Sequence, residues 1–322
     1  MTFAELLDRF RGKRALVIGD LMLDEYHFGR ATRISPEAPV MVIRHERTEH
    51  VPGGAANVAL NLRALGAVPT LIGVSGCDQA GDELAASLSR SGLEIGAIIR
   101  DPSRPTTRKT RIVADHSHQV LRMDSESDGM LSPEKESEVQ AAIEQFATVS
   151  DVIVLSDYLK GMLTPAIAQS AIAAARLAGV PAVANPKPRS LPQYRGASLI
   201  SLNRAEAAEA TGRFRGLPNE EALDAAESVR KSLEADAVLV TLGESGMAAA
   251  GPEQIHVPAP KVEVYDTAGA GDTVIATVAL GLAAAGFRRE VFELAAQTSA
   301  CVVRHVGVAT PSEKDLVDLP NR

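Results

Sequence analysis

One short turn combines a flexible backbone with a carboxylate. Residues 266–272 read Asp-Thr-Ala-Gly-Ala-Gly-Asp and run directly into a long apolar segment, Val274 to Ala285. Small residues let successive backbone N–H groups point at one spot, and the positive end of a following helix favours a phosphate there. Asp272 could accept the proton of a hydroxyl that attacks the phosphorus, or it could simply cap the helix.

A pair of glycines precedes another predicted helix, residues 55–66. Gly53 and Gly54 would let a ligand approach the backbone closely, and the amide of Asn57 offers a donor and an acceptor to a sugar hydroxyl. A tight strand-to-helix turn with Asn57 on the surface explains the same residues equally well. The sequence alone leaves both interpretations open.

Charged side chains follow several predicted strands at the point where each strand ends. Asp20 and Asp157 could hold sugar hydroxyls, and Lys160 and Lys187 could neutralise phosphate charge. Parallel sheets bind ligands beyond the carboxyl ends of their strands, which favours this interpretation. Taken singly, an acid after a glycine is also an ordinary turn residue, and a lysine is more often just solvated.

Two further strand ends suit a nucleotide. Asn203 and Glu206 have the spacing of a helix capping box, which explains them better than a metal site from local sequence alone. Thr241, Gly243 and Gly246 form a glycine-bearing turn of a kind that is also common elsewhere. The sequence has no Gly-x-x-x-x-Gly-Lys-Ser/Thr loop and no protein-kinase signature, so phosphoryl transfer would have to use the 266–272 turn.

Basic residues cluster between positions 100 and 122, although the chain carries a net charge of −8. Lys109 and Arg111 would project from one face of a strand, because side chains alternate with a period of two. Such a face could hold a phosphate already present on the substrate. A charged lid edge that discourages aggregation is an equally plausible interpretation.

Short β-branched runs alternate with longer amphipathic or alanine-rich segments. Near-continuous apolar strands separated by helices predict an α/β fold, a mostly parallel sheet with helices on both faces. The predicted strands are residues 14–19, 69–76, 151–157, 181–185, 198–203 and 237–243, and the predicted helices are residues 55–66, 81–92, 133–148, 164–179, 204–212 and 219–234.

Two segments alternate apolar with polar side chains instead, residues 40–51 and 108–124, which predicts half-exposed antiparallel strands. We expect one domain over residues 1–322, with a small β lid inserted at about 25–51 and 98–124. A lid beside a phosphoryl-transfer site would keep water from the nucleotide.

The composition excludes several classes of protein. A chain of 322 residues that is 45% hydrophobic and 23% charged is typical of a soluble globular protein. A pI near 5.5 gives no electrostatic support to nucleic-acid binding. Residues 1–14 lack the apolar run of a signal peptide, and the longest apolar stretch is too short to span a bilayer. Cys77 and Cys301 are isolated thiols, and we expect a cytoplasmic protein without a membrane partner.

The order of these pieces resembles that of the ribokinase-like, phosphofructokinase-B type carbohydrate kinases, from about Lys13 to about Thr310. Within that family the chain is most similar to the D-glycero-D-manno-heptose 7-phosphate kinases of lipopolysaccharide core synthesis. Gly-Gly-x-x-Asn and Gly-Ala-Gly-Asp are specific to the superfamily, and Arg-Ile-Ser-Pro-Glu-Ala-Pro-Val at 33–40 is the sharper marker of the heptose group. The other matching segments are residues 19–24, 52–59, 155–161 and 264–275.

The resemblance implies an enzyme that uses ATP and Mg²⁺ to phosphorylate the anomeric hydroxyl of the heptose 7-phosphate, in ADP-heptose synthesis. It makes Asp272 the catalytic base, gives Mg²⁺ to Glu206 and the nucleotide phosphates, and suggests a monovalent cation such as K⁺ near Asp266. It assigns an anion hole to Ala268, Gly269, Ala270 and Gly271; sugar hydroxyls to Asp20, Gly53, Gly54 and Asn57; substrate or transferred phosphate to Lys109, Arg111, Asp157, Lys160 and Lys187; and nucleotide contacts to Asn203, Glu206, Thr241, Gly243, Gly246 and Cys301.

The chain departs from the family pattern at Asn185, where many relatives have Asp, and at Ala268, which replaces a commoner Thr. The His-x-Gly-His signature of the nucleotidylyltransferase often fused to heptose kinases is absent, so we expect the stand-alone kinase, as a homodimer through exposed lid strands. Two alternatives stay open. One is a ribokinase-like kinase for another sugar; the other is a non-catalytic nucleotide- or sugar-sensing protein, against which the intact Asp272 speaks.

Overall fold

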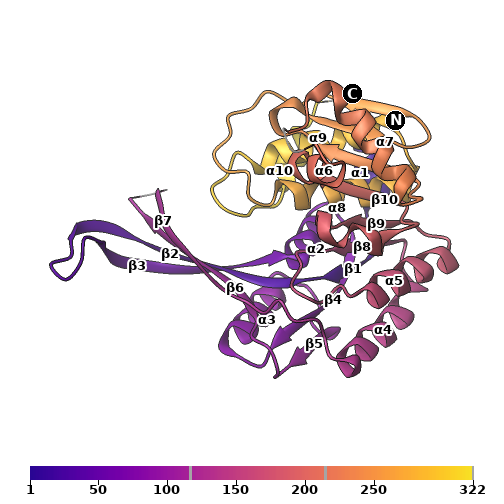
Figure 1. Cartoon of the computed structure of the whole chain (residues 1–322). Coiled ribbons are helices and arrows are strands. Elements are labelled where there is room, and N and C mark those ends of the chain that lie inside the picture. Colours follow the sequence, from indigo (N-terminus) through magenta and orange to yellow (C-terminus); the bar gives the residue numbers. More distant parts are fainter. Residues whose placement is uncertain (116–117, 214–215, 321–322) are drawn as a thin grey trace.

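Two sheets of different size organise the protein, whose computed structural model describes residues 1–115, 118–213 and 216–320 (Figure 1). Within these residues the larger sheet has the strand order β13-β12-β11-β10-β9-β8-β1-β4-β5. Neighbouring strands run parallel, except at the β11-β12-β13 edge. Its strands are β1 (Arg14–Gly19), β4 (Val68–Gly76), β5 (Ile98–Asp101), β8 (Val152–Ser156), β9 (Ala182–Asn185), β10 (Leu199–Asn203), β11 (Ala237–Thr241), β12 (Met247–Ala250) and β13 (Gln254–Val257).

Helices cover both faces of this sheet, because side chains alternate along each strand. On β1, Val17 packs in the core beneath α1, α2, α3, α8 and α9, whereas Leu16 and Ile18 pack beneath α4, α5, α6 and α7. The predicted mostly parallel α/β architecture is confirmed. The helices are α1 (Phe3–Phe10), α2 (Ala55–Ala64), α3 (Gln79–Arg90), α4 (Pro133–Ala147), α5 (Pro165–Ala178), α6 (Arg204–Ala210), α7 (Ala222–Ser232), α8 (Ala270–Ala285), α9 (Arg289–Val302) and α10 (Glu313–Val317).

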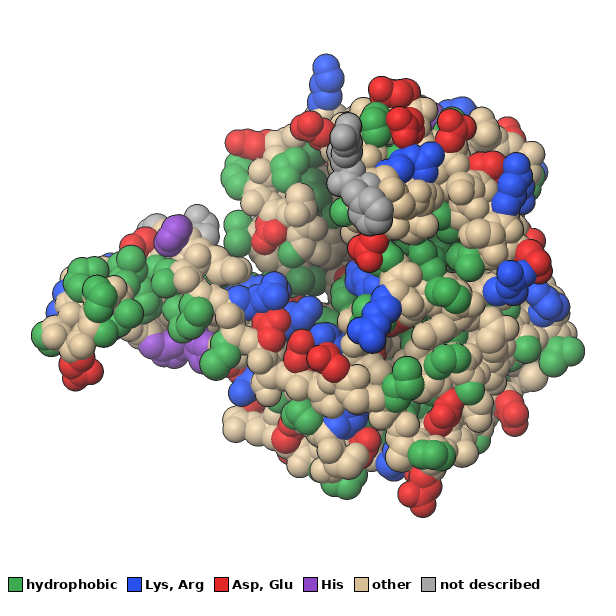
Figure 2. Space-filling view, in the orientation of Figure 1, with side chains coloured by type: hydrophobic (Ala, Val, Ile, Leu, Met, Phe, Trp, Pro, Cys, Tyr) green, Lys and Arg blue, Asp and Glu red, His purple; other side chains and the backbone are tan. Residues whose placement is uncertain are grey.

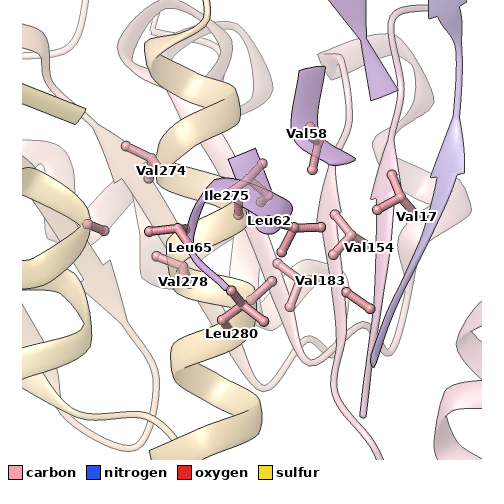
Figure 3. Close-up of a cluster of buried hydrophobic side chains, with 14 of the residues drawn as sticks. Val17, Val58, Leu62, Leu65, Val154, Val183, Val274, Ile275, Val278 and Leu280 are labelled. Carbon is pink, nitrogen blue, oxygen red and sulfur yellow. The ribbon is translucent and has the colours of Figure 1, made fainter. Parts of the chain in front are cut away.

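Helices α2 and α8 pack against each other over the middle of the large sheet (Figure 3). Val58 and Leu62 of α2 share one apolar cluster with Ile275 and Val278 of α8, and all four side chains are fully buried. Burying a side chain of this kind stabilises the fold by about 1.5–3 kcal/mol. Helix α8, which begins at the 266–272 turn, is therefore packed firmly into the core.

The smaller sheet, called the lid from here on, extends away from the body (Figure 1). Its strand order is β3-β2-β6-β7, with β2 (Leu21–Ile34), β3 (Met41–Gly54), β6 (Thr107–Ala114) and β7 (His118–Ser125). Strand β2 starts buried and becomes exposed towards its end. The two alternating segments do form lid strands, and residues 116 and 117 of the second segment lie outside the described residues.

The lid begins and ends at different residues than predicted. Ile98–Asp101 is β5, which pairs in parallel with β4 of the large sheet instead of belonging to the lid. Residues 21–24, predicted to lie outside the lid, already pair with β3. The pairing reaches this far because β3 runs beside β2 until the chain turns at Gly54 (φ +61°). Among the described residues, no helix combines the length and apolarity needed to cross a membrane.

Candidate active site

The Asp272 carboxylate lies in the first turn of α8 and is 6% exposed. Its Oδ2 accepts a hydrogen bond from Asn57 Nδ2 at 2.6 Å, and its Oδ1 accepts one from the Tyr158 hydroxyl at 2.8 Å. Burial raises the pKa of Asp272 to about 6, against the lowering effect of these two bonds and of Lys187. A carboxylate whose pKa lies this close to neutral pH is suited to accept a proton.

Buried polar side chains fix the position of Asn57. Asn61 Nδ2 donates to the backbone oxygen of Asn57 at 2.9 Å and to its Oδ1 at 3.3 Å, and the Thr273 hydroxyl donates to Asn61 Oδ1 at 2.7 Å. These hydrogen bonds form a chain from Thr273 of α8 through Asn61 and Asn57 of α2 to Asp272 of α8. The sequence predicted a sugar contact for Asn57; its Oδ1 already accepts one hydrogen bond, which leaves a lone pair of that oxygen and the second N–H of the amide for that role.

The turn before α8 offers fewer free N–H groups than predicted. The N–H of Ala268 donates to Asp266 Oδ1 at 2.9 Å, and that of Ala270 donates within the turn. Both residues were predicted to form part of an anion hole, and in this structure their N–H groups donate within the protein. Gly269, with φ +80°, and Gly271 have N–H groups without an acceptor among the described residues. At the positive end of α8 they are the donors that a phosphate would meet.

A cleft opens in front of this helix end, where the carboxyl ends of the parallel strands meet. Figure 2 shows lysine and arginine side chains gathered in the hollow between the lid and the body. The cleft is lined by Tyr158, Asn185, Lys187, Ser201, Leu202, Asn203, Glu206, Thr241, Gly269, Gly271 and Asp272.

Glu206 and Lys187 form an ion pair in this cleft, with Nζ and Oε1 2.7 Å apart. The Oε2 atom of Glu206 accepts the N–H of Asn203 at 2.8 Å, and the Asn203 side chain accepts the N–H of Glu206 at 2.9 Å. The capping box predicted from the spacing is confirmed. A metal ion at Glu206 would have to share that carboxylate with Lys187.

Tyr158 also lines the cleft, although it was not among the site residues predicted from the sequence. Besides its bond to Asp272, its ring centroid lies 5.0 Å from Lys187 Nζ and 5.7 Å from Lys109 Nζ. Burial, followed by the charge of Asp272, raises its pKa well above the usual value, so the hydroxyl keeps its proton and donates. The only sequence signal was its place at the end of β8, directly after Asp157.

Asp24 is a second residue that the sequence-based assignment omitted. It is 4% exposed, pairs with Arg111, and lies against Gly53. A Cβ atom on Gly53 would come within 2.2 Å of Asp24 Oδ2, so this carboxylate requires glycine there. Gly54, whose positive φ turns the chain, also could not carry a side chain without meeting the backbone oxygen of Asp20.

Asp20 and Asp157 use their carboxylates inside the protein, and both are 2% exposed. Both carboxylates were predicted to contact the substrate, and in this structure they accept hydrogen bonds from the protein. The hydroxyls of Ser190 and Tyr194 donate to Asp157 Oδ2 at 2.5 and 2.8 Å. Burial raises the pKa of Asp20 to about 6. The Asp20 oxygens accept three backbone N–H groups at 2.7, 3.1 and 3.2 Å, those of Tyr158, Lys160 and Met162.

Three more residues were predicted to bind phosphate: Lys160, which follows β8, and Lys109 and Arg111 of the lid strand β6. Lys160 Nζ lies 2.7 Å from Glu126 and 3.5 Å from Asp128, so its charge is already paired. Lys109 is half-buried, which lowers its pKa, and it has no ion-pair partner among the described residues. Arg111 lies on the same face of β6 as Lys109 and pairs with Asp24. Lys109 is therefore the one of these three whose charge is unpaired among the described residues, and Arg111 would have to share its guanidinium between Asp24 and a phosphate.

Only some of the predicted nucleotide residues line a cleft. Thr241 lines the cleft described above, and Gly243 and Gly246 turn the chain after it with φ +62° and +94°. Cys301 is half-buried near the end of α9, where burial raises its pKa to about 11. Arg304, three residues after Cys301, lines a second cleft. The other residues lining this cleft are Lys261, Val262, Glu263, Tyr265, His305 and Asp315.

Asp266 joins the turn before α8 to the segment after α9. Its Oδ1 accepts the N–H of Ala268 at 2.9 Å, and its Oδ2 accepts the N–H of Gly307 at 2.9 Å. Each oxygen keeps a further lone pair. The carboxylate therefore holds two chain segments together and can still accept a cation.

Comparison with known proteins places the chain in a family. Residues 13–315 match the pfkB family of carbohydrate kinases. Two relatives, both named bifunctional protein HldE, come from Caulobacter sp. strain K31 (44% identical over 321 residues) and Bradyrhizobium sp. strain ORS 278 (42% over 319 residues). The alignments cover 99% and 98% of this chain but only 65% and 64% of those proteins.

Solved structures share the fold. Phosphofructokinase-2 from Escherichia coli in complex with potassium superposes with a TM-score of 0.76 at 19% identity, over 95% of this chain and 97% of that one. Arabidopsis thaliana ribokinase complexed with ribose and ATP gives 0.72 at 20% identity, over 95% and 98%. Because the family match runs over nearly the whole chain and the fold agrees, the chain belongs to the pfkB family of carbohydrate kinases and has the ribokinase-like fold.

Proposed function

We propose that the chain phosphorylates the anomeric hydroxyl of D-glycero-D-manno-heptose 7-phosphate with ATP, giving the 1,7-bisphosphate used for the ADP-heptose of the lipopolysaccharide core. The observation that carries the phosphoryl transfer is the buried Asp272 carboxylate beside the free N–H groups of Gly269 and Gly271. Choice of the heptose rests on the 33–40 motif, on the relatives named HldE, and on Lys109 and Arg111 as a seat for the 7-phosphate. As an ATP user, the enzyme would work in the cytoplasm.

In the proposed reaction the sugar hydroxyl attacks the terminal phosphorus of ATP, the new O–P bond forms as the bond to ADP breaks, and Asp272 takes the hydroxyl proton. Asn57 and Tyr158 hold the carboxylate in place. A carboxylate with a pKa of about 6 is a far weaker base than a sugar alkoxide, so proton transfer comes late. Positioning and the donors of Gly269 and Gly271 supply most of the rate.

Mg²⁺ bound with ATP would neutralise phosphate charge. Glu206 has the carboxylate oxygens that this ion prefers, and it lines the same cleft as Gly271. Sharing Glu206 with Mg²⁺ would release the Lys187 ammonium for the transferred phosphate. A monovalent cation such as K⁺ beside Asp266 belongs to the same proposal, since E. coli phosphofructokinase-2, a relative by fold, is known in complex with potassium.

The substrate is tested by mixing the enzyme, ATP and Mg²⁺ with a panel of sugars and sugar phosphates. ADP release is expected to be fastest with the heptose 7-phosphate, with a new anomeric phosphate in the ³¹P spectrum. Asp272→Asn is expected to fold, bind ATP and lose nearly all turnover. Faster turnover of another sugar would replace the proposed substrate, and wild-type turnover by Asp272→Asn would remove Asp272 as the base.

Replacing the Tyr158 hydroxyl tests how Asp272 is kept ionised. Tyr158→Phe removes a donor that lowers the pKa of Asp272, so that pKa rises further. Activity requires the ionised form and falls as the pH drops through the pKa. The acid limb of kcat/KM is therefore expected to move upward by about one to two pH units, because a hydrogen bond to a charged group contributes about 1.5–3 kcal/mol.

Tyr194→Phe is the matched control, because it removes a buried hydroxyl that bonds to Asp157 and not to Asp272. An acid limb that stays in place in Tyr158→Phe, or moves equally in both variants, contradicts the assigned role of Tyr158.

The basic pair of the lid tests recognition of the 7-phosphate. Lys109→Ala with Arg111→Ala is expected to raise KM for the heptose phosphate by about tenfold or more, since each charge-assisted bond contributes about 1.5–3 kcal/mol. Lys109→Met removes only the ammonium and leaves the Arg111–Asp24 ion pair in place, so it measures the contribution of Lys109 to KM by itself. Arg30→Ala, towards the exposed end of β2 and paired with Glu46, is the control. An unchanged KM in the double variant would rule out the phosphate seat.

We also propose a homodimer through the lid. Large apolar side chains are exposed on it, including Ile34, Met41, Leu121 and Met123, and exposed apolar strand faces mark interaction surfaces. The molar mass in solution is expected to be twice the 33.9 kDa of one chain. Leu121→Glu with Met123→Glu should give monomers, whereas Leu177→Glu on α5 should not. A monomeric wild-type protein would contradict the proposal.

A further inference from the structure

A histidine and two glutamates converge at the root of the lid, on the face of β2 opposite to Asp24. Glu25 of β2 lies across from His50 of β3 in the strand register, and Glu83 comes from α3, which packs against both strands. His50 Nε2 lies 3.2 Å from Glu25 Oε2 and 2.9 Å from Glu83 Oε2. Figure 2 shows histidine side chains gathered along the lower edge of the lid.

The second oxygen of each carboxylate is held by another residue. Glu25 Oε1 bonds to His27 Nε2 at 2.8 Å and accepts the Thr110 hydroxyl at 3.2 Å. Glu83 Oε1 accepts the amide of Gln79 at 2.7 Å. These contacts leave the Oε2 atom of each glutamate directed at the same imidazole nitrogen. Outer contacts of this kind are what orients metal ligands in proteins.

The spacing of the three atoms suits a small metal ion. Their ligand atoms all lie within 4.8 Å of one another. Four ligands at about 2.0–2.2 Å from a tetrahedral ion are about 3.3–3.5 Å apart, close to the 2.9 and 3.2 Å found here.

We propose that Glu25, His50 and Glu83 bind one divalent transition-metal ion of the zinc class, which fastens the lid strands to helix α3. An imidazole ligand favours zinc-like ions over Mg²⁺, which prefers oxygen. Two carboxylates and a neutral imidazole balance the charge of such an ion. The site is separate from the kinase chemistry, because Asp24 and Glu25 are adjacent on β2 and point to opposite faces of the lid.

Arg108 competes with the metal, since its guanidinium lies 3.6 Å from Glu25 Oε2. The Arg108 side chain is 37% exposed and can turn towards solvent. Its presence weakens the site without blocking it. This gives a variant, Arg108→Gln, that should bind the ion more tightly than the wild type.

The test is a Zn²⁺ titration of chelator-treated enzyme by calorimetry, without ATP or Mg²⁺, with Co²⁺ absorption as a second probe. One Zn²⁺ per chain is expected, together with a higher Tm and slower hydrogen exchange in β3 and α3. His50→Gln and Glu83→Gln should remove this binding. Gln79→Ala, an exposed side chain whose loss leaves the fold intact, should weaken it about 10- to 100-fold.

Two controls separate this site from unspecific binding. His256→Gln replaces an exposed histidine on β13, and Cys77→Ser removes an exposed thiol; both should keep the full affinity. Wild-type enzyme that takes up no stoichiometric Zn²⁺ overturns the proposal. So does binding that persists unchanged in His50→Gln, Glu83→Gln and Gln79→Ala, or that disappears in Cys77→Ser.

Discussion

An ionised carboxylate held almost completely out of water is the interaction on which the rest of this protein depends. Burial alone would drive the pKa of Asp272 up until the group kept its proton. Hydrogen bonds from Asn57 and Tyr158 and the charge of Lys187 oppose this, and the resulting pKa is about 6. The group is therefore ionised at neutral pH, yet more basic than an exposed aspartate.

Each of the two donors to Asp272 has its own support. Asn57 is held by the Asn61 and Thr273 bonds between α2 and α8, which share a fully buried apolar cluster. Tyr158 is held by Asp20, whose carboxylate accepts the Tyr158 backbone N–H at 2.7 Å. A second buried acid thus fixes the segment that carries the tyrosine. The packing of α2 against α8 and the segment that carries Tyr158 therefore both fix the position of the two Asp272 carboxylate oxygens.

Part of this arrangement could be predicted from the sequence. Strand–helix alternation was enough to predict the large sheet, and the small-residue turn was enough to place Asp272 at a helix end. The direction of strand-end side chains was not predictable: Asp20 binds backbone N–H groups while Asp24 lies beside Arg111, and only the strand register distinguishes them. Tyr158 could not be found because its partner is 114 positions away in the chain.

The most direct measurement is a ¹³C NMR titration of the Asp272 carboxyl carbon, assigned by the loss of its signal in Asp272→Asn. That assignment is needed because burial raises the pKa of Asp20 to about 6 as well. The structure predicts a midpoint at about pH 6 for Asp272. A midpoint near the value of an exposed aspartate, about 3.9, would contradict the account of a buried base that its hydrogen bonds keep ionised.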